Sequence, residues 1–189
     1  MKRLISIAIL TMAVCVAALA APARHDGDTV NVGGSPMLPT QNIIENAVNS
    51  KDHTILVAAV KAAGLVDALS GKGPFTVFAP EDSAFKLLPD GTVDNLLKPE
   101  NKEMLVKILT YHVVAGRLDS KTLRHLIRAG GGKAELTTLS GGKLWAMMNG
   151  PTNIVILDEK GDTANIPTYD VYQSNGVIQV IDRVLMPND

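Results

Sequence analysis

The strongest fold signal in the chain is the stretch GPFTVFAPEDSAF, residues 73–85. Its first half alternates two sets of side chains, Phe75, Val77 and Ala79 against Thr76, Phe78 and Pro80. Both sets are largely apolar, so a β-strand here would have two buried faces and would lie inside the molecule. Just after it, Asp82 or Ser83 could accept hydrogen bonds from the free amides that open a following helix. Phe85 and Leu88 would then pack beneath that helix.

Helical patterns surround this strand, and strand patterns follow them. Apolar residues recur at intervals of three and four, which predicts helices near 43–48, 55–63, 83–88, 93–97, 100–110 and 120–129. Short β-prone stretches separated by turn residues predict strands at 111–114, 134–139, 143–148, 153–157, 163–166, 169–173 and 177–185. Helices followed by a run of antiparallel hairpins predict an α+β fold.

Three motifs of this chain resemble those of the fasciclin (FAS1) domain family. Residues 73–85 are similar to the first family signature, residues 174–187 (SNGVIQVIDRVLMP) resemble the second, and residues 111–116 (YHVVAG) resemble the central tyrosine-histidine element. The motifs occur in family order, and the resemblance covers about residues 40–187. It implies a fasciclin-like fold, with antiparallel β-sheets forming a wedge or sandwich and several short α-helices packed at one side.

We interpret the motif residues as architecture rather than as a site. They are Phe75, Thr76, Val77, Phe78, Ala79, Pro80, Asp82, Phe85, Tyr111, His112, Asn175, Gly176, Ile178, Ile181 and Asp182. The Asn175-Gly176 pair is a strong signal for a tight turn, because glycine tolerates positive φ. The chain departs from the family pattern at two places, with Gln179 where histidine is frequent and Ala115 where proline is frequent.

The amino terminus is typical of an export signal. Lys2 and Arg3 precede an apolar run, and Ala18-Leu19-Ala20 supplies the small residues that a signal peptidase reads. We therefore predict a signal peptide over residues 1–20, a flexible linker over 21–39, and one domain over 40–187. The alternatives are an uncleaved membrane anchor and a lipid-anchored Cys15. Cleavage after Ala20 would place the protein in the periplasm or outside the cell.

Composition narrows the classes of function. The chain has 18 Lys and Arg against 19 Asp and Glu, a net charge of −1, which loss of Lys2 and Arg3 would take to −3. Such a balance offers no basic field for nucleic acid, so we expect no nucleic-acid partner. Loss of the signal peptide would also remove Cys15, the only cysteine, and with it any thiol or sulfur-ligated metal chemistry.

Motifs for catalysis and for metal binding are missing from the sequence. There is no Gly-x-Ser-x-Gly, no His-Glu-x-x-His and no phosphate-binding loop. His112 could be a base, a ligand or a pH switch, but without a spaced second histidine we interpret it as a structural residue fixed by hydrogen bonds. We interpret Asp158, Glu159 and Asp162 as a solvated hairpin turn rather than a calcium loop. The expected protein is not an enzyme and holds no cofactor or metal.

Two functions from different classes fit these observations. The resemblance implies an extracytoplasmic adhesion or protein-interaction module whose partner is a cell-surface, matrix or envelope protein or glycan. We expect the module to be a monomer. In the family an aspartate followed by an aliphatic residue before the second signature has been tied to receptor engagement, and Asp170-Val171 matches that place; an ordinary strand is the alternative. The second function is binding of a small lipid-like or carbohydrate ligand in a groove, for which Trp145, Met147 and Met148 are the candidate lining.

Overall fold

The computed structural model describes residues 29–188. The expected signal peptide and the first part of the expected linker lie outside these residues. The helices are α1 (Ile43–Ala47), α2 (Thr54–Ala63), α3 (Val66–Ser70), α4 (Asp82–Phe85), α5 (Thr92–Leu96), the 3-10 helix η1 (Pro99–Asn101), α6 (Lys102–Tyr111) and α7 (Ser120–Ala129). The strands are β1 (Val30–Val32), β2 (Ser35–Met37), β3 (Phe75–Pro80), β4 (Val113–Ala115), β5 (Lys133–Thr137), β6 (Lys143–Asn149), β7 (Asn153–Leu157), β8 (Thr163–Asn165), β9 (Thr168–Gln173) and β10 (Gly176–Ile181).

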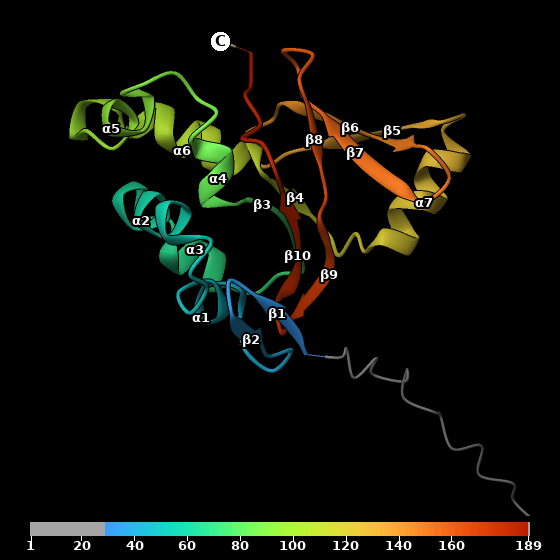
Figure 1. Cartoon of the computed structure of the whole chain (residues 1–189), viewed down its shortest axis with the longest axis horizontal. Helices are drawn as coiled ribbons and strands as arrows, with labels where there is room; N and C mark the ends of the chain where they lie inside the picture. The colour runs from blue at the N-terminus through green and yellow to red at the C-terminus, as the bar shows by residue number, and fades with distance from the viewer. Residues whose placement is uncertain (1–28, 189) are drawn as a thin grey trace, which may run out of the picture.

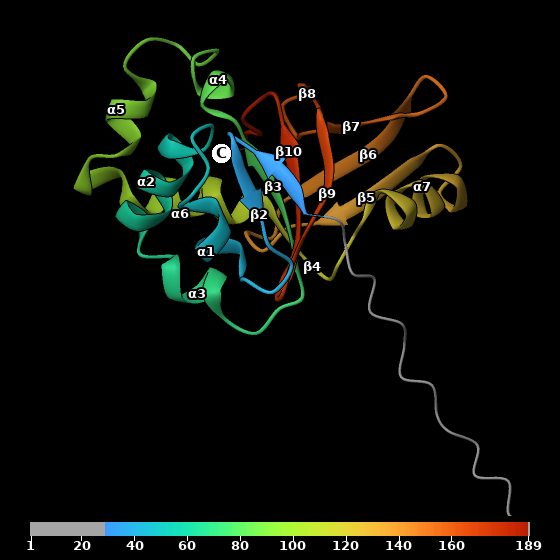
Figure 2. The same ribbon diagram turned by 60° about the horizontal axis from the view of Figure 1, so that its bottom comes forward.

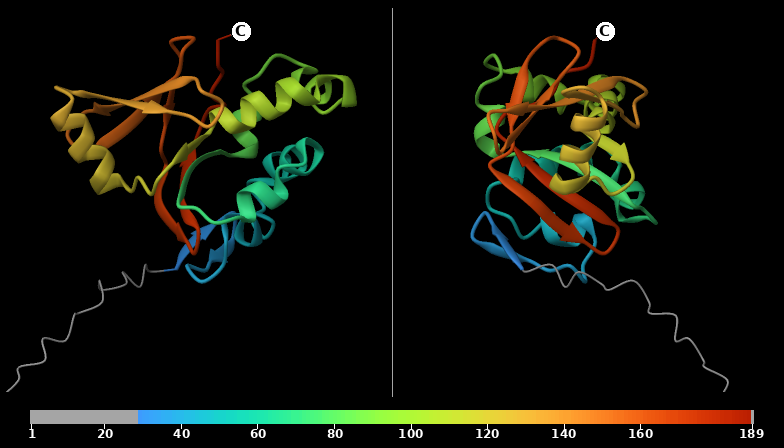
Figure 3. Two further views of the ribbon diagram at one scale, coloured as in Figure 1. Left: turned by 180° about the vertical axis from the view of Figure 1, so that it is seen from behind. Right: turned by 90° about the vertical axis from the view of Figure 1, so that its right-hand side faces the viewer.

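The strands form two four-stranded sheets and a small hairpin. The orders are β4-β3-β10-β9 for the central sheet, β5-β6-β7-β8 for the outer sheet and β1-β2 for the hairpin. Helices α1 to α6 lie on one side of the central sheet, and the outer sheet with α7 lies on the other (Figure 1). The view from behind shows the two sheets diverging like the faces of a wedge (Figure 3). The expected α+β class is confirmed.

The central sheet joins the two signature motifs. β3 and β10 pair in parallel, with Phe75 opposite Gly176 and Pro80 opposite Ile181. The sequence pattern predicts antiparallel sheets only, and this pair is the exception, because nothing local in either strand reveals that a distant strand runs beside it. Every residue of β10 is buried, as expected for a strand enclosed on both faces.

Alternate residues of β3 and β10 pack into two separate cores. Val77, Ala79, Ile178 and Val180 face the helical layer, where they join residues from α1, α2 and α6. Phe78 faces the opposite way, into the core between the two sheets, which Leu123 and Ile127 of α7 also enter. Residues 75–80 are therefore apolar on both faces because each face of the strand packs into a different core.

The expected linker is wrong over its second half. Residues 30–37 form the β1-β2 hairpin (blue in Figure 2) instead of a tether. Its turn is held by a hydrogen bond from the Lys51 amide to the Gly33 carbonyl. Val32 and Met37 are 7% and 3% exposed and belong to the helix-side core. Val30, which is partly buried, packs against the same core. Three apolar side chains are too few to form a clear strand pattern, so the glycines and prolines dominate the sequence.

The expected strand 177–185 also ends early, at Ile181. β3 stops at Pro80, so β10 has no parallel partner beyond that point. The following segment turns toward α6, where the Leu185 amide donates to Nε2 of His112 at 2.9 Å.

Asp82 caps a different helix from the one expected. Its carboxylate accepts from the amides of Thr54 and Ile55, at 3.2 and 2.9 Å, and from the Thr54 hydroxyl. These groups open α2, whose own N-cap residue, His53, makes no side-chain cap. No side chain caps α4, of which Asp82 is the first residue. Within residues 29–188 no helix is long and apolar enough to cross a membrane.

Candidate functional site

Asp170 in β9, the first sequence-predicted interaction residue, is engaged inside the molecule. Its carboxylate accepts from the Ser120 amide at 2.6 Å, from the Ser120 hydroxyl at 2.5 Å and from Nε2 of Gln179 at 2.9 Å. The Asp170 amide donates to Oε1 of Gln179 at 3.1 Å. Asp170 also has φ of 57°, the left-handed region that aspartate tolerates better than most residues. The residue therefore ties β9 to the start of α7.

Val171, the second sequence-predicted interaction residue, faces the helix-side core and is 1% exposed. Its side chain cannot reach a partner in this fold. The Asp170 carboxylate is also engaged, because its hydrogen bonds join it to Ser120 and Gln179 of the same chain. The ordinary-strand alternative describes Val171, while Asp170 serves as a helix cap.

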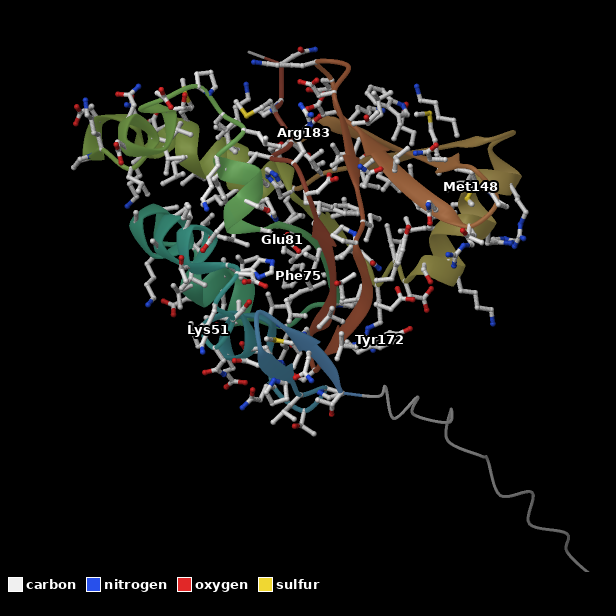
Figure 4. The ribbon with its side chains drawn as sticks, viewed as in Figure 1. Lys51, Phe75, Glu81, Met148, Tyr172 and Arg183 are labelled. Atoms are coloured by element: carbon white, nitrogen blue, oxygen red, sulfur yellow. The ribbon has the colours of Figure 1, made fainter. Side chains whose placement is uncertain are left out.

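A second carboxylate completes the cap of α7. Asp119 is its N-cap residue and accepts from the Thr122 amide at 2.7 Å. The hydroxyl of Tyr172, at the lower end of β9 in Figure 4, donates to the other Asp119 oxygen at 3.2 Å. Burial raises the pKa of Asp119, but the hydrogen bonds from Thr122 and Tyr172 outweigh it and lower that pKa. Burial and the nearby carboxylates of Asp119 and Asp170 raise the pKa of the Tyr172 hydroxyl to about 12.

His112 lies at the end of α6 and is buried, with 3% of its surface exposed. Nδ1 donates to the Ile108 carbonyl at 2.8 Å, and Nε2 accepts from the Leu185 amide at 2.9 Å. A ring that must accept at Nε2 is neutral, and burial lowers its pKa to about 4. Both nitrogens are occupied, as the structural interpretation requires, and neither can act as a base or a ligand.

Tyr111, the neighbour of His112, is likewise a structural residue. It is wholly buried, and its hydroxyl donates to the Lys143 carbonyl at 2.7 Å and accepts from the Glu159 amide at 3.0 Å. Asp158, next to Glu159, is 1% exposed and departs from the expected solvated turn, whose residues 160–162 are exposed. Its oxygens accept from the amides of Lys160, Asp162 and Met186. These carboxylate oxygens are therefore already used by backbone N–H groups.

Asn175 joins the turn between β9 and β10 to the helical layer. Its Oδ1 accepts from the Ile43 amide at 3.0 Å, and its Nδ2 donates to the Leu69 and Gly71 carbonyls at 2.8 and 2.9 Å. One side chain thus holds the start of α1 and the end of α3. The turn signal in the sequence predicts the bend, but not these three contacts.

An open polar groove of about 870 Å³ lies beside this turn. Its walls come from segments far apart in the sequence: Thr40, Asn42, Glu45, the loop 70–74, Arg117, Ser174 and Asn175. Lys72 and Arg117 are exposed on it, and the Arg117 guanidinium donates to the Gln173 carbonyl at 3.1 Å. We call these residues the turn groove. Sequence reasoning missed it because no local pattern brings these four segments together.

The expected ligand-groove residues divide between the two faces of β6, with Trp145 and Met147 on one face and Met148 on the other. Met148, which Figure 4 places on the outer sheet, packs against the core between the sheets. The Trp145 ring lies under Nζ of Lys133, 4.5 Å from the ring centroid. An apolar cavity of about 50 Å³ lies instead between the helical layer and the central sheet.

Comparison with known proteins agrees with this arrangement. The model of the Fasciclin domain matches residues 51–187. The chain belongs to the fasciclin domain family. The resemblance seen in the three motifs is thereby confirmed, and the motif residues lie where the domain's two cores meet.

Relatives of this fasciclin-domain chain include bacterial and animal proteins. Protein sll1483 of Synechocystis sp. is 45% identical over 146 residues, 77% of this chain and 73% of that protein. Immunogenic protein MPB70 of Mycobacterium bovis is 33% identical over 75% of this chain and 66% of its own length. Transforming growth factor-beta-induced protein ig-h3 of Sus scrofa is 32% identical over 79% of this chain, which spans 20% of that protein.

A solved structure confirms the fold. The FAS1 domain pair from the insect cell adhesion molecule Fasciclin I superposes with a TM-score of 0.70 at 20% sequence identity. The match covers 79% of this chain and 52% of that one. The expected fasciclin-like architecture is correct, with the parallel β3-β10 pair as its unforeseen part.

Proposed function

We propose that this chain is an exported adhesion or protein-interaction module without catalytic activity. Membership of the fasciclin family carries the proposal, since one relative by fold is a cell adhesion molecule. A signal peptide over residues 1–20 and a mature chain beginning at Ala21 form part of it. The partner is a cell-surface, matrix or envelope protein or glycan.

The turn groove is the surface we propose for this contact. It is open, and it combines exposed cations with amide and hydroxyl groups. It lies next to β9, the strand in which Asp170 is hydrogen-bonded to Ser120 and Val171 is buried. Lys72 is exposed in its loop, whereas Arg117 also supports β9 through the Gln173 carbonyl. Substitution of Lys72 therefore perturbs the groove with little effect on the fold.

The proposal is tested by attachment of the purified mature chain to intact cells and to envelope extract. We expect specific retention that Lys72→Glu weakens at least about tenfold, as for a residue at the centre of an interface. Lys98→Glu is the matched control, because Lys98 is an exposed lysine near the 3-10 helix and outside the groove. Equal loss with both variants would assign the effect to net charge and reject the groove. Absence of any specific retention would reject the adhesion proposal itself.

A further inference from the structure

Two Asn-Gly pairs occur in the chain, and each lies at a turn between antiparallel strands. Asn149-Gly150 joins β6 to the turn before β7, and Asn175-Gly176 joins β9 to β10. In such a pair the asparagine side chain is close to the next backbone nitrogen, and glycine has no Cβ to block their approach. Both pairs are therefore candidates for the same spontaneous reaction.

That reaction is the loss of ammonia from asparagine. The glycine backbone nitrogen attacks Cγ of asparagine, a C–N bond forms, and the bond between Cγ and Nδ2 breaks. Nδ2 leaves as ammonia and takes the proton of the attacking N–H, so the product is a succinimide ring. Water then opens the ring at either carbonyl and leaves aspartate or isoaspartate. Water is the only co-reactant, but the backbone must be free to bring the nitrogen onto Cγ.

The fold holds Asn175 away from this reaction. Its Oδ1 accepts from the Ile43 amide at 3.0 Å, and its Nδ2 donates to two carbonyls at the end of α3, at 2.8 and 2.9 Å. Gly176 is buried, and a Cβ added there would collide with the Phe75 carbonyl. The side chain and the following backbone are both fixed, so attack on Cγ requires three hydrogen bonds to break and a packed strand to move.

Asn149 lies in the opposite situation. Asn149 and Gly150 are both exposed, and a Cβ added at Gly150 would meet no atom within 4 Å. The side-chain hydrogen bonds of this turn involve Thr152 and Asn153 instead of Asn149.

The backbone around Asn149 is also the easiest part of its sheet to open. Asn149 faces Asn153 as the last pair of the β6-β7 ladder, and ladder ends open at a small free-energy cost. Gly150 has φ of 79°, outside the strand conformation. Met148, labelled in Figure 4, directly precedes this pair and still packs against the core, so the freedom begins at Asn149.

We propose that Asn149 is a site of spontaneous deamidation, whereas the fold protects Asn175 in the same dipeptide. The product carries one more negative charge at the turn, and isoaspartate also lengthens the backbone there by a methylene group. The site shares no residue with the turn groove. The proposal therefore does not depend on the proposed function.

The test follows both asparagines in one sample of the purified, unmodified mature chain. The chain is incubated in warm, mildly alkaline buffer and digested at mildly acidic pH, which suppresses further reaction. Mass spectrometry measures conversion in the peptides that contain Asn149 and Asn175, and isoaspartyl methyltransferase labelling counts isoaspartate. We expect Asn149 to convert at least about tenfold faster than Asn175, the factor that one or two lost hydrogen bonds represent.

The same incubation in concentrated urea separates the fold from the local sequence. Once the chain is unfolded, the rate at Asn175 should rise toward the rate at Asn149. Asn149→Gln is the matched variant, since it should keep the parental urea midpoint and lose most of the isoaspartate label. Equal rates in the folded chain, or a folded chain in which Asn149 stays intact while the unfolded chain converts it, would overturn the proposal.

Discussion

At the residue scale, Asp170 offers the most direct test of the internal contacts. Replacing it with alanine removes three acceptor interactions at the start of α7 and places a less tolerant residue at φ of 57°. We expect Asp170→Ala to lower the free energy of unfolding by about 1–3 kcal/mol. Urea denaturation at neutral pH measures this loss.

Asp170→Asn and Asp90→Ala provide the comparison. Asparagine keeps one acceptor oxygen and tolerates positive φ, so its cost should be smaller than that of alanine. Asp90 is an exposed loop residue, and its loss should change stability by less than about 0.5 kcal/mol. If Asp170→Ala were as stable as the parent but attached less well to cells, the structural role would be contradicted and Asp170 would be an interaction residue.

His112 makes stability depend on pH. Its pKa is about 4 in the folded chain, against an ordinary value of 6.5 when unfolded. Between these values the unfolded state binds more protons, so stability is complete above pH 6.5 and is lost as the pH falls toward 4. We expect a loss of about 2 kcal/mol from this residue between pH 7.5 and pH 5.

Urea titrations at both pH values measure this loss in the parent, His112→Gln and His125→Gln. Glutamine does not titrate, so the free energy of unfolding of His112→Gln should fall less between pH 7.5 and pH 5 than that of the parent. His125 is exposed on α7 and serves as the control, with the parental pH slope expected. Burial lowers the pKa of His53 too, so part of the acid loss should remain in His112→Gln. Identical slopes in all three chains would contradict the assignment to His112.

At the element scale, helix α2 depends on a cap supplied from outside its own sequence. Asp82→Ala removes the acceptor for Thr54 and Ile55, and we expect a loss of about 0.5–2 kcal/mol with faster hydrogen exchange in the first turn of α2. Ser83→Ala should be nearly neutral, because the Ser83 hydroxyl bonds only the Glu81 carboxylate. If hydrogen exchange in Asp82→Ala became faster in α4 rather than in α2, Asp82 would cap α4, as the local sequence suggests.

The sequence predicts elements better than it predicts their connections. Residues 120–129 form a helix as expected because period, cap and glycine stop all agree locally. The cap on α2 comes from Asp82, and Asp170 adds a contact with the Ser120 amide to the local Asp119 cap of α7. Both Asp82 and Asp170 lie far in the chain from the helices they bond. Aspartate is common in turns and strand ends, so its type and position alone say nothing about which amide it faces. The same limit explains why the local sequence leaves open whether Asp170 and Val171 are an interaction pair or part of an ordinary strand.

At the scale of the whole molecule, the central sheet should respond unequally on its two faces. Ile181 is wholly buried in the core between the sheets, and Ile181→Ala should cost about 2–5 kcal/mol in unfolding free energy. Phe75 is only partly buried at the start of β3, so Phe75→Ala should cost less than Phe78→Ala, whose ring has no exposure. Urea midpoints of the three variants test this order, and a larger effect at Phe75 would contradict the assignment of Phe78 to the core.

The two-core arrangement lies beyond what periodicity can show. Alternation in residues 75–80 predicts that both faces are buried, which is correct, but not that each face belongs to a different core. The turn groove arises only when α1, the loop after α3 and the turn before β10 meet, and the apolar cavity arises only when the helical layer packs on the central sheet. Both features therefore require the tertiary structure.

The parallel pairing of β3 with β10 also bears on how the chain reaches its folded state. The paired segments are on the order of 100 residues apart, so the entropy of closing a long loop must be overcome before their contacts form. The central sheet cannot close until the last strand is available, which makes a slow, late step in folding the expected behaviour. Under the export proposed above, this delay would be useful. The sheet would stay open, and the chain threadable, until its carboxyl end had crossed the membrane.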